Sequence, residues 1–348
     1  MDQPLIVCCS QGYYEDWREW AVKLTGERAQ WAFFDDRPIL PWERLIRRPN
    51  SSLIRASFQA VMRVVRGRAR LLITQGPSAA FWCGLLCRVF GVNVSHSTDA
   101  FNFAVLPTGL QRRLMRYAFR QIGSFQVHSS VEIGMYSEYF DIPKERIRLR
   151  LWSIGVPQVA PQSPIEEGRY VSAIGGNGRD YGTLLDACRR LPEIPFVLVV
   201  RPENLAELDI PANVKALIDL PLAKAMNVLQ FSAFTVLPLS DAVRPSGHVT
   251  LVCAMHLGKT VVATDSAGIA DYVQPRENAL LCEAQSAEKM AEAIAKLWAD
   301  PEKTLRMGEA NRQFGKLHCS ETQMRSDLAR VLADAGIPIK HGAVGRPA

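Results

Sequence analysis

The sequence predicts an α/β protein of two doubly wound domains, each with a parallel sheet between layers of helices. Three observations predict this fold class. Short β-branched apolar runs alternate with longer amphipathic segments, 348 residues suit two domains of ordinary size, and a proline-rich stretch interrupts the alternation near the middle. The apolar share of 48% and the charged share of 22% are those of a soluble globular protein, which excludes disordered and fibrous classes.

The first half of the chain begins the alternation. Its expected strands are Leu5–Cys9, Leu71–Gln75, Val92–His96 and Phe125–His128, and its expected helices are Ala79–Phe90 and Leu110–Ile122. The most apolar run, residues 79–94, contains Gly84 and Arg88 and is too short to span a bilayer. We therefore expect a buried core helix there.

A linker and a second domain follow. Three prolines lie within residues 157–164, a stretch without regular period, so we place a linker at 158–164. The first domain then covers 1–157, the second 165–336, and the residues 337–348, which have no period, form a frayed tail. The expected strands of the second domain are Tyr170–Ile174, Phe196–Val200, Val214–Ile218, Phe234–Pro238 and Thr260–Thr264.

Cysteine usage and the chain start point to the cytoplasm. The eight cysteines lie mostly in apolar patterns and form no C-x-x-C pair, so we expect buried, reduced thiols and no metal site. The N-terminus enters a strand-like run directly, with no basic n-region and no cleavage site.

The net charge of +6 is uneven along the chain. Residues 1–160 hold 21 Lys and Arg against 13 Asp and Glu. A basic first half suits an anionic partner such as a membrane surface, a lipid phosphate or an acidic glycan, and suits nucleic acid less because aromatic-basic RNA signatures are lacking. A solvated arginine-rich surface explains the same numbers equally well.

The helix expected at 110–122 has two different faces. Its apolar residues are Leu110, Leu114, Ala118 and Ile122, and its basic residues are Arg112, Arg113, Arg116 and Arg120. Such a helix can lie on an anionic bilayer. It can also be a surface helix whose apolar face belongs to the core, and the two interpretations are compatible.

Two loops of the second domain have the character of phosphate sites. In doubly wound sheets, ligands bind where strands lead into helix N-termini, whose N–H groups favour anions. The first loop, 173–181, contains Gly175, Gly176 and Gly178, followed by Arg179, which can donate two charge-assisted hydrogen bonds. A glycine-rich turn with a surface ion pair is the alternative.

The second loop, 238–248, leads into a helical run at 249–257. Ser246 is a suitable N-cap, and Gly247 and His248 would place backbone N–H groups at the helix start. An ordinary capped helix with a solvent-facing histidine is the alternative. In the first domain, His96 and Asp99 lie at the end of an expected strand, where a cleft should open, although such histidines are often structural.

Six segments of residues 125–320 occur in an order and spacing that belong together: VHSS (127–130), DIPKERI (141–147), GV (155–156), RDYGTLLDA (179–187), AMHLGKTVVAT (254–264) and NALL (278–281). In this order they resemble the family-four retaining glycosyltransferases of GT-B fold. The first 120 residues share only the strand–helix rhythm. The resemblance implies two Rossmann-like domains facing a cleft, with an acceptor-binding domain at 1–157 and a nucleotide-sugar donor-binding domain at 165–336.

The resemblance also implies a reaction. A nucleoside diphosphate-sugar would bind with its diphosphate near Gly175, Gly176, Arg179 and residues 246–248. Arg201 and Asp241 would belong to the same donor site, and His96 and Asp99 would act catalytically on the sugar. Transfer would retain the anomeric configuration without metal, cofactor or enzyme nucleophile, onto a glycan or lipid-linked acceptor. Such an enzyme (EC 2.4) would serve surface polysaccharide or glycolipid biosynthesis as a cytoplasmic or peripheral membrane protein.

One departure from the family pattern concerns its paired glutamates, spaced E-x7-E. Ungapped counting places Pro245 and Cys253 at these positions, and neither can accept the hydrogen bonds of ribose hydroxyls. Ser246, His248 or Thr250 could replace them. A catalytically silent module that binds a glycan or a protein is the alternative function.

Overall fold

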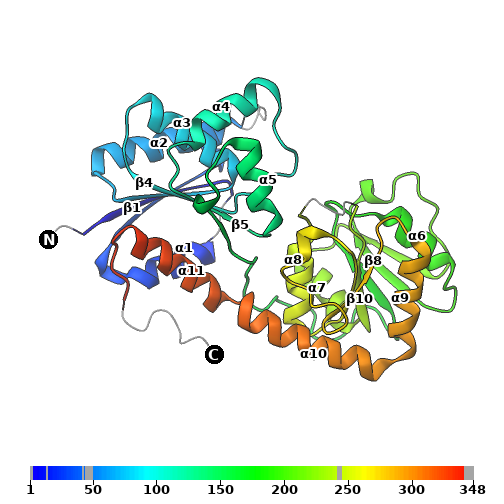
Figure 1. The fold of residues 1–348 in the computed structure, drawn as a ribbon. Helices are drawn as coiled ribbons and strands as arrows, with labels where there is room; N and C mark the ends of the chain where they lie inside the picture. Colours follow the sequence, from blue (N-terminus) through cyan, green and yellow to red (C-terminus); the bar gives the residue numbers. More distant parts are fainter. Residues whose placement is uncertain (1–2, 13–14, 41–42, 44–49, 241–244, 341–348) are drawn as a thin grey trace. The chain divides into compact units, whose positions relative to one another are not determined.

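The computed structural model describes residues 3–12, 15–40, 43, 50–240 and 245–340. The chain forms two compact units. The first unit comprises Met1–Arg150 and Met324–Pro347, and the second comprises Leu151–Gln323. Each unit contains one six-stranded sheet whose neighbouring strands are all parallel (Figure 1).

The sheet of the first unit has the order β2-β1-β3-β4-β5-β6. The strands are β1 (Leu5–Ser10), β2 (Gln30–Asp35), β3 (Leu71–Gln75), β4 (Ser95–Asp99), β5 (Ser124–Val127) and β6 (Ile147–Leu149). The helices are α1 (Glu15–Thr25), α2 (Ser51–Gly67), α3 (Pro77–Val89), α4 (Gly109–Phe119), α5 (Val131–Phe140) and most of α11 (Glu321–Asp334). Side chains of β1 alternate between two apolar cores: Ile6 packs with α1 and α11, and Val7 packs with α2 and α3. Both faces of the sheet are therefore covered.

The sheet of the second unit has the order β12-β11-β10-β7-β8-β9. The strands are β7 (Val171–Ile174), β8 (Phe196–Val200), β9 (Val214–Ile218), β10 (Phe234–Leu237), β11 (Val261–Thr264) and β12 (Ala279–Cys282). The helices are α6 (Tyr181–Arg189), α7 (Leu222–Phe231), α8 (His248–His256), α9 (Ala287–Ala299) and α10 (Pro301–His318). Helices α7 and α8 pack on one face of this sheet, and α6 and α9 pack on the other.

The domain boundaries differ from those expected. The units divide after Arg150 rather than at 158–164, and residues 324–336 belong to the first unit rather than the second. The cause is the apolar face of α11, whose Leu328 and Leu332 are buried in one core with Trp17 and Trp20 of α1.

Residues 337–340, which were expected to belong to a frayed tail at 337–348, contact the first unit. Ile337 is buried in the same core as α11, and the backbone N–H of Lys340 donates to the carbonyl of Leu24 at 2.9 Å. Residues 341–348 lie outside the described part of the chain.

The expected strand Val92–His96 is shifted by three residues, because β4 covers Ser95–Asp99. Its polar side chains find partners inside the sheet: Thr74 Oγ1 lies 3.0 Å from His96 Nε2 and 2.9 Å from Thr98 Oγ1. Strands β2 and β6 were not expected from the sequence.

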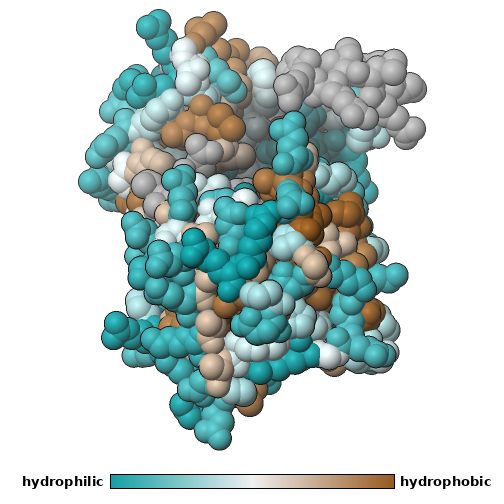
Figure 2. Space-filling model, turned by 90° about the vertical axis from the view of Figure 1, so that its right-hand side faces the viewer, coloured by the Kyte–Doolittle hydropathy of each residue, from teal (hydrophilic) through white to brown (hydrophobic). Residues whose placement is uncertain are grey.

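The described residues contain no helix with the length and apolar character needed to span a bilayer. Hydrophilic side chains dominate the face shown in Figure 2, where apolar residues form smaller groups. All eight cysteines are buried and none is in a disulfide.

Candidate functional site

The strand order of the second unit reverses beside β7. From β7 the chain continues through β8 to β9 on one side, and then crosses to β10, β11 and β12 on the other. Ligands of doubly wound sheets bind outside the carboxyl ends of the strands at such a reversal. The loops that leave β7 and β10 at this point are the two expected from the sequence, 175–180 and 238–247, of which 241–244 lie outside the described residues.

Backbone hydrogen bonds hold these two loops together. The N–H of Asp180 donates to the carbonyl of Pro238 at 2.9 Å, and the N–H of Ser240 donates to the carbonyl of Gly178 at 3.2 Å. Gly178 has a φ of +64°, and a Cβ on it would lie 3.2 Å from Ser246 Oγ. Glycine at this position therefore permits both the turn and the close approach of the second loop.

Gly175 makes room for Arg179. Its φ is +114°, and a Cβ there would lie 2.9 Å from Nη2 of Arg179 and 3.3 Å from Thr250 Oγ1. The hydroxyl of Tyr181 donates to the Gly175 carbonyl at 2.6 Å and fixes the loop from its other end. The glycines expected to admit a phosphate thus also admit the arginine expected to bind it.

The Arg179 guanidinium lies at the centre of the cluster. Nη1 donates to the carbonyl of Asn177 at 2.8 Å and Nη2 donates to Thr250 Oγ1 at 3.1 Å, while Nε is buried with no hydrogen-bond partner among the described residues. Burial lowers the pKa of Arg179 from its ordinary value. Over the part of the chain that the structure describes, no carboxylate forms an ion pair with this cation. The expected alternative, a surface ion pair, is absent from these residues.

Helix α8 begins beside this guanidinium. Its N-cap is Gly247, with a φ of +85° and no side-chain cap, rather than Ser246 as expected. A Cβ at Gly247 would lie 3.0 Å from Leu239 Cδ2, which explains why glycine occupies the cap. Ser246 Oγ is buried and has no hydrogen-bond partner within the described residues. The first N–H groups of α8 and a buried hydroxyl therefore meet at one place, an arrangement that suits an anion.

His248 is the first residue of α8, and its ring is held in place rather than exposed to solvent. Nε2 lies 2.8 Å from the carbonyl oxygen of Gly268, and the ring stacks on Tyr272 with centroids 4.9 Å apart. Burial, with a smaller contribution from the positive charge of Arg179, lowers the pKa of His248, so the ring is neutral at pH 7.

Arg201 follows β8 and is tied to the first loop. Its Nη1 donates to Asn177 Oδ1 at 3.0 Å, and its backbone N–H donates to Asn204 Oδ1 at 3.1 Å. The Asn204 amide in turn donates to the carbonyl of Gly176 at 2.8 Å. The structure thus groups Arg201 with the expected glycine loop, whereas Asp241 lies outside the described residues.

Sequence reasoning missed Asn177, Tyr181, Asn204 and Thr250 as parts of this cluster, apart from naming Thr250 as a possible replacement. Asn177 stands inside the glycine loop, and Asn204 follows the strand end by four residues. Their position as polar residues just after predicted strands is the feature of the sequence that could have identified them as part of the site.

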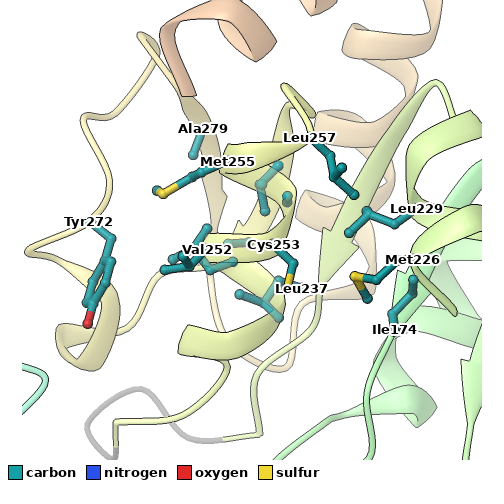
Figure 3. Close-up of a cluster of buried hydrophobic side chains, with 14 of the residues drawn as sticks. Ile174, Met226, Leu229, Leu237, Val252, Cys253, Met255, Leu257, Tyr272 and Ala279 are labelled. Carbon is teal, nitrogen blue, oxygen red and sulfur yellow. The ribbon is translucent and has the colours of Figure 1, made fainter. Parts of the chain in front are cut away.

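Cys253 lies in the apolar core of the second unit. Figure 3 shows its side chain among Ile174, Met226 and Leu237, and only 4% of the residue is exposed. Burial raises the pKa of the thiol to about 12. The position at which the resemblance would place the second glutamate therefore faces inward in this chain.

His96 and Asp99, the expected catalytic residues, lie on β4 of the first unit, and a catalytic role for either of them stays a prediction. They stand three residues apart in β4, so their side chains point to opposite faces of the sheet. Burial lowers the pKa of His96 to about 3. The carboxylate of Asp99 lies 2.5 Å from Nη2 of Arg150. Both side chains thus have structural partners within the first unit.

Comparisons with known proteins concern the second unit and the fold. Residues 184–314 match the family model of the glycosyl transferases group 1. No curated protein sequence matches significantly. HepE of Anabaena, solved with UDP, is 13% identical with a TM-score of 0.70, over 95% of this chain and 100% of that chain.

Two further solved structures have the same fold. Sucrose-phosphate synthase of Thermosynechococcus elongatus is 15% identical with a TM-score of 0.68, over 95% of this chain and 98% of that one. A glycosyltransferase of Rickettsia africae is 11% identical with a TM-score of 0.69, over 96% and 99%. At these identities the likeness shows the fold. The chain therefore has the GT-B fold, and its second unit contains the region matched by the glycosyl transferases group 1 family.

Proposed function

We propose that the protein is a glycosyltransferase that moves a sugar from a nucleoside diphosphate-sugar to a hydroxyl of a glycan or lipid-linked acceptor. The observation that carries the proposal is the Arg179 guanidinium, buried beside the start of α8 without an ion-pair partner among the described residues. Together, the guanidinium and the helix start present the positive charge that a diphosphate needs.

The same charges suit the departure of the nucleoside diphosphate. Negative charge grows on the leaving phosphate as the glycosidic bond breaks, and donors fixed in advance stabilise it without reorganising. The neutral His248 and the buried Ser246 hydroxyl lie at the helix start and would orient the phosphate. Because Arg179 and α8 supply the positive charge, we propose transfer without a metal ion. Retention of the anomeric configuration is proposed from the resemblance of residues 125–320 to retaining glycosyltransferases.

UDP is the nucleotide to test first, since structures of HepE hold UDP, UDP with glucose, and UDP-glucose. The proposed setting is surface polysaccharide or glycolipid assembly at the cytoplasmic side of a membrane. The likeness to the lipopolysaccharide outer core galactosyltransferase WaaB, 9% identical with a TM-score of 0.67, is consistent with such a setting.

A second candidate function rests on Cys253. Because a core thiol stands where the family has a glutamate, a module that binds a glycan or protein without catalysis is the competing proposal. Thermal unfolding with UDP, GDP and ADP tests the two. Stabilisation by one of them, followed by release of that nucleotide from its sugar conjugate in the presence of acceptor, supports transfer. A protein that none of the three stabilises is the silent module.

A further inference from the structure

The first unit presents exposed apolar side chains on the outer side of helices α2, α3 and α4. These helices lie together over one face of its sheet, with α3 in contact with both neighbours (Figure 1). The apolar residues, each more than one third exposed, are Phe58, Val89, Phe90, Leu110, Leu114 and Tyr117. We call this group the outer helix surface.

Side-chain contacts join these residues into one line across the three helices. The Phe58 ring of α2 meets the Phe90 ring at the end of α3, with centroids 6.3 Å apart. Val89 is the neighbour of Phe90, and the next residue back, Arg88, places its guanidinium 4.1 Å from the ring centre of Tyr117 on α4. The surface is thus continuous from α2 to α4.

Helix α4 differs from the expectation that its whole apolar face belongs to the core. Leu110 is 71% exposed and Leu114 is 39% exposed, whereas Met115 and Ala118 are buried. Leu110, Leu114 and Tyr117 follow a helical spacing of four and three residues, so they share one outward stripe. Water, rather than a protein core, therefore faces this stripe in the described unit.

The charge of the same helices has one sign. Helices α2, α3 and α4 contain seven arginines and no aspartate or glutamate. Some of this charge is compensated, since Arg55 pairs with Glu43 and Arg116 pairs with Asp141. Arg66, Arg88 and Arg113 form no ion pair with any carboxylate of the described chain.

We propose that the outer helix surface docks the protein onto an anionic lipid bilayer. The arginines complement lipid phosphates, and the exposed aliphatic and aromatic side chains enter the boundary between headgroups and acyl chains. A nucleic acid would satisfy the arginines but leave Val89, Leu110 and Leu114 without an apolar partner, so a bilayer fits both halves of the surface. The inference is independent of the proposed sugar transfer.

Flotation of the full-length protein with lipid vesicles tests the proposal. The protein is expected to float with vesicles of phosphatidylcholine containing one third phosphatidylglycerol, and to bind phosphatidylcholine alone much more weakly. Each arginine near an anionic surface strengthens binding roughly fivefold, so the double variant Arg66→Gln, Arg113→Gln is expected to lose roughly 25-fold. High salt should weaken wild-type binding in the same direction.

A second double variant, Leu110→Ser with Leu114→Ser, tests the apolar half and is expected to weaken binding to anionic vesicles at every salt concentration. The matched controls lie in the second unit: Leu305→Ser, at a residue 73% exposed, and Arg190→Gln at an exposed arginine. Circular dichroism and melting temperature report whether each variant folds like the wild type.

Two outcomes would overturn the proposal. One is that the wild-type protein stays with the bottom fraction at low salt, or that the surface variants float as well as the controls. The other is that an RNA or DNA oligonucleotide binds more tightly than the vesicles and responds to the arginine variant alone, which would assign the surface to nucleic acid. The flotation experiment contains no nucleotide-sugar, so its outcome neither supports nor contradicts the proposed sugar transfer.

Discussion

Replacing Arg179 by methionine should remove nucleotide binding while leaving the fold intact. In the unliganded protein the variant loses two hydrogen bonds, at 2.8 Å to Asn177 and 3.1 Å to Thr250, together about 1–3 kcal/mol net. The variant also avoids the cost of burying a cation whose Nε lacks a partner among the described residues. Removing this cost should stabilise the folded protein by about 1–3 kcal/mol. The two effects oppose each other, so the free energy of unfolding should change by no more than about 2 kcal/mol.

The liganded protein should behave differently. A nucleotide at a hundredfold excess over its dissociation constant stabilises the wild-type protein by about 2.7 kcal/mol, and the Arg179→Met variant should gain almost nothing under the same conditions. Urea titration with and without UDP measures both quantities on one sample. The matched control is Arg190→Met, one residue beyond the end of α6, which should leave stability and nucleotide response within about 0.5 kcal/mol of wild type.

A structural role for Arg179 would reverse this pattern. If the arginine held the two loops together, the unliganded variant would lose about 3 kcal/mol or more, as when a paired buried charge loses its partner. If the variant kept its stabilisation by UDP, Arg179 would have no part in binding the diphosphate, and that result refutes its assignment to the leaving group.

Four further predictions concern both units. Leu332→Ala on α11 should destabilise the first unit by about 2–5 kcal/mol and leave the response to UDP unchanged, as measured by tryptophan fluorescence during urea unfolding. Gly178→Ala should cost about 1–3 kcal/mol at its φ of +64° and weaken UDP binding through contact with Ser246, measured by calorimetry. Since burial lowers the His96 pKa from 6.5 to about 3, the unfolded chain binds that proton first as pH falls. The free energy of unfolding of the first unit should therefore fall by up to about 1.4 kcal/mol per pH unit as the pH drops from 6.5 to about 3. In the His96→Gln variant, the urea midpoint should change less with pH over the same range. Transfer should continue in EDTA at an unchanged rate; loss of activity that Mg²⁺ restores would contradict the metal-free proposal.

The sequence predicted strands β3 and β8 with the observed bounds, because both are buried along their whole length and are nearly continuous apolar runs. Strand β9, at the sheet edge and only partly buried, also has the expected bounds. Strand β4 was misplaced by three residues because its sequence SHSTD has no apolar pattern, whereas Val92 and Val94 just before it do. Its stability comes from hydrogen bonds to β3, a tertiary feature that periodicity does not report.

The return of α11 to the first unit could not be predicted from its own residues. An amphipathic helix has the same pattern whichever core it covers. Leu328 and Leu332 are buried in the core that contains Trp17, Trp20 and Leu24 of α1, which the sequence of α11 alone does not reveal. The donor loops were easier to find. Glycines and arginine at strand ends are local signals, whereas the Arg179–Thr250 contact joins residues 71 positions apart.

The residues at positions 245 and 253 affect the electrostatics of the candidate site. The resemblance of residues 125–320 to family-four glycosyltransferases would place two glutamates there, but this chain has Pro245 and a core thiol at Cys253 beside the guanidinium of Arg179. The positive charge at the start of α8 is therefore less compensated, which favours a diphosphate and removes the acceptors that would hold ribose. Asn177 and Asn204 are the neutral groups next to the glycine loop, and both are already tied to Arg201. We therefore expect affinity to depend on the diphosphate more than on the nucleoside, so that UDP, GDP and ADP should differ less in affinity here than at a site with a ribose-binding carboxylate.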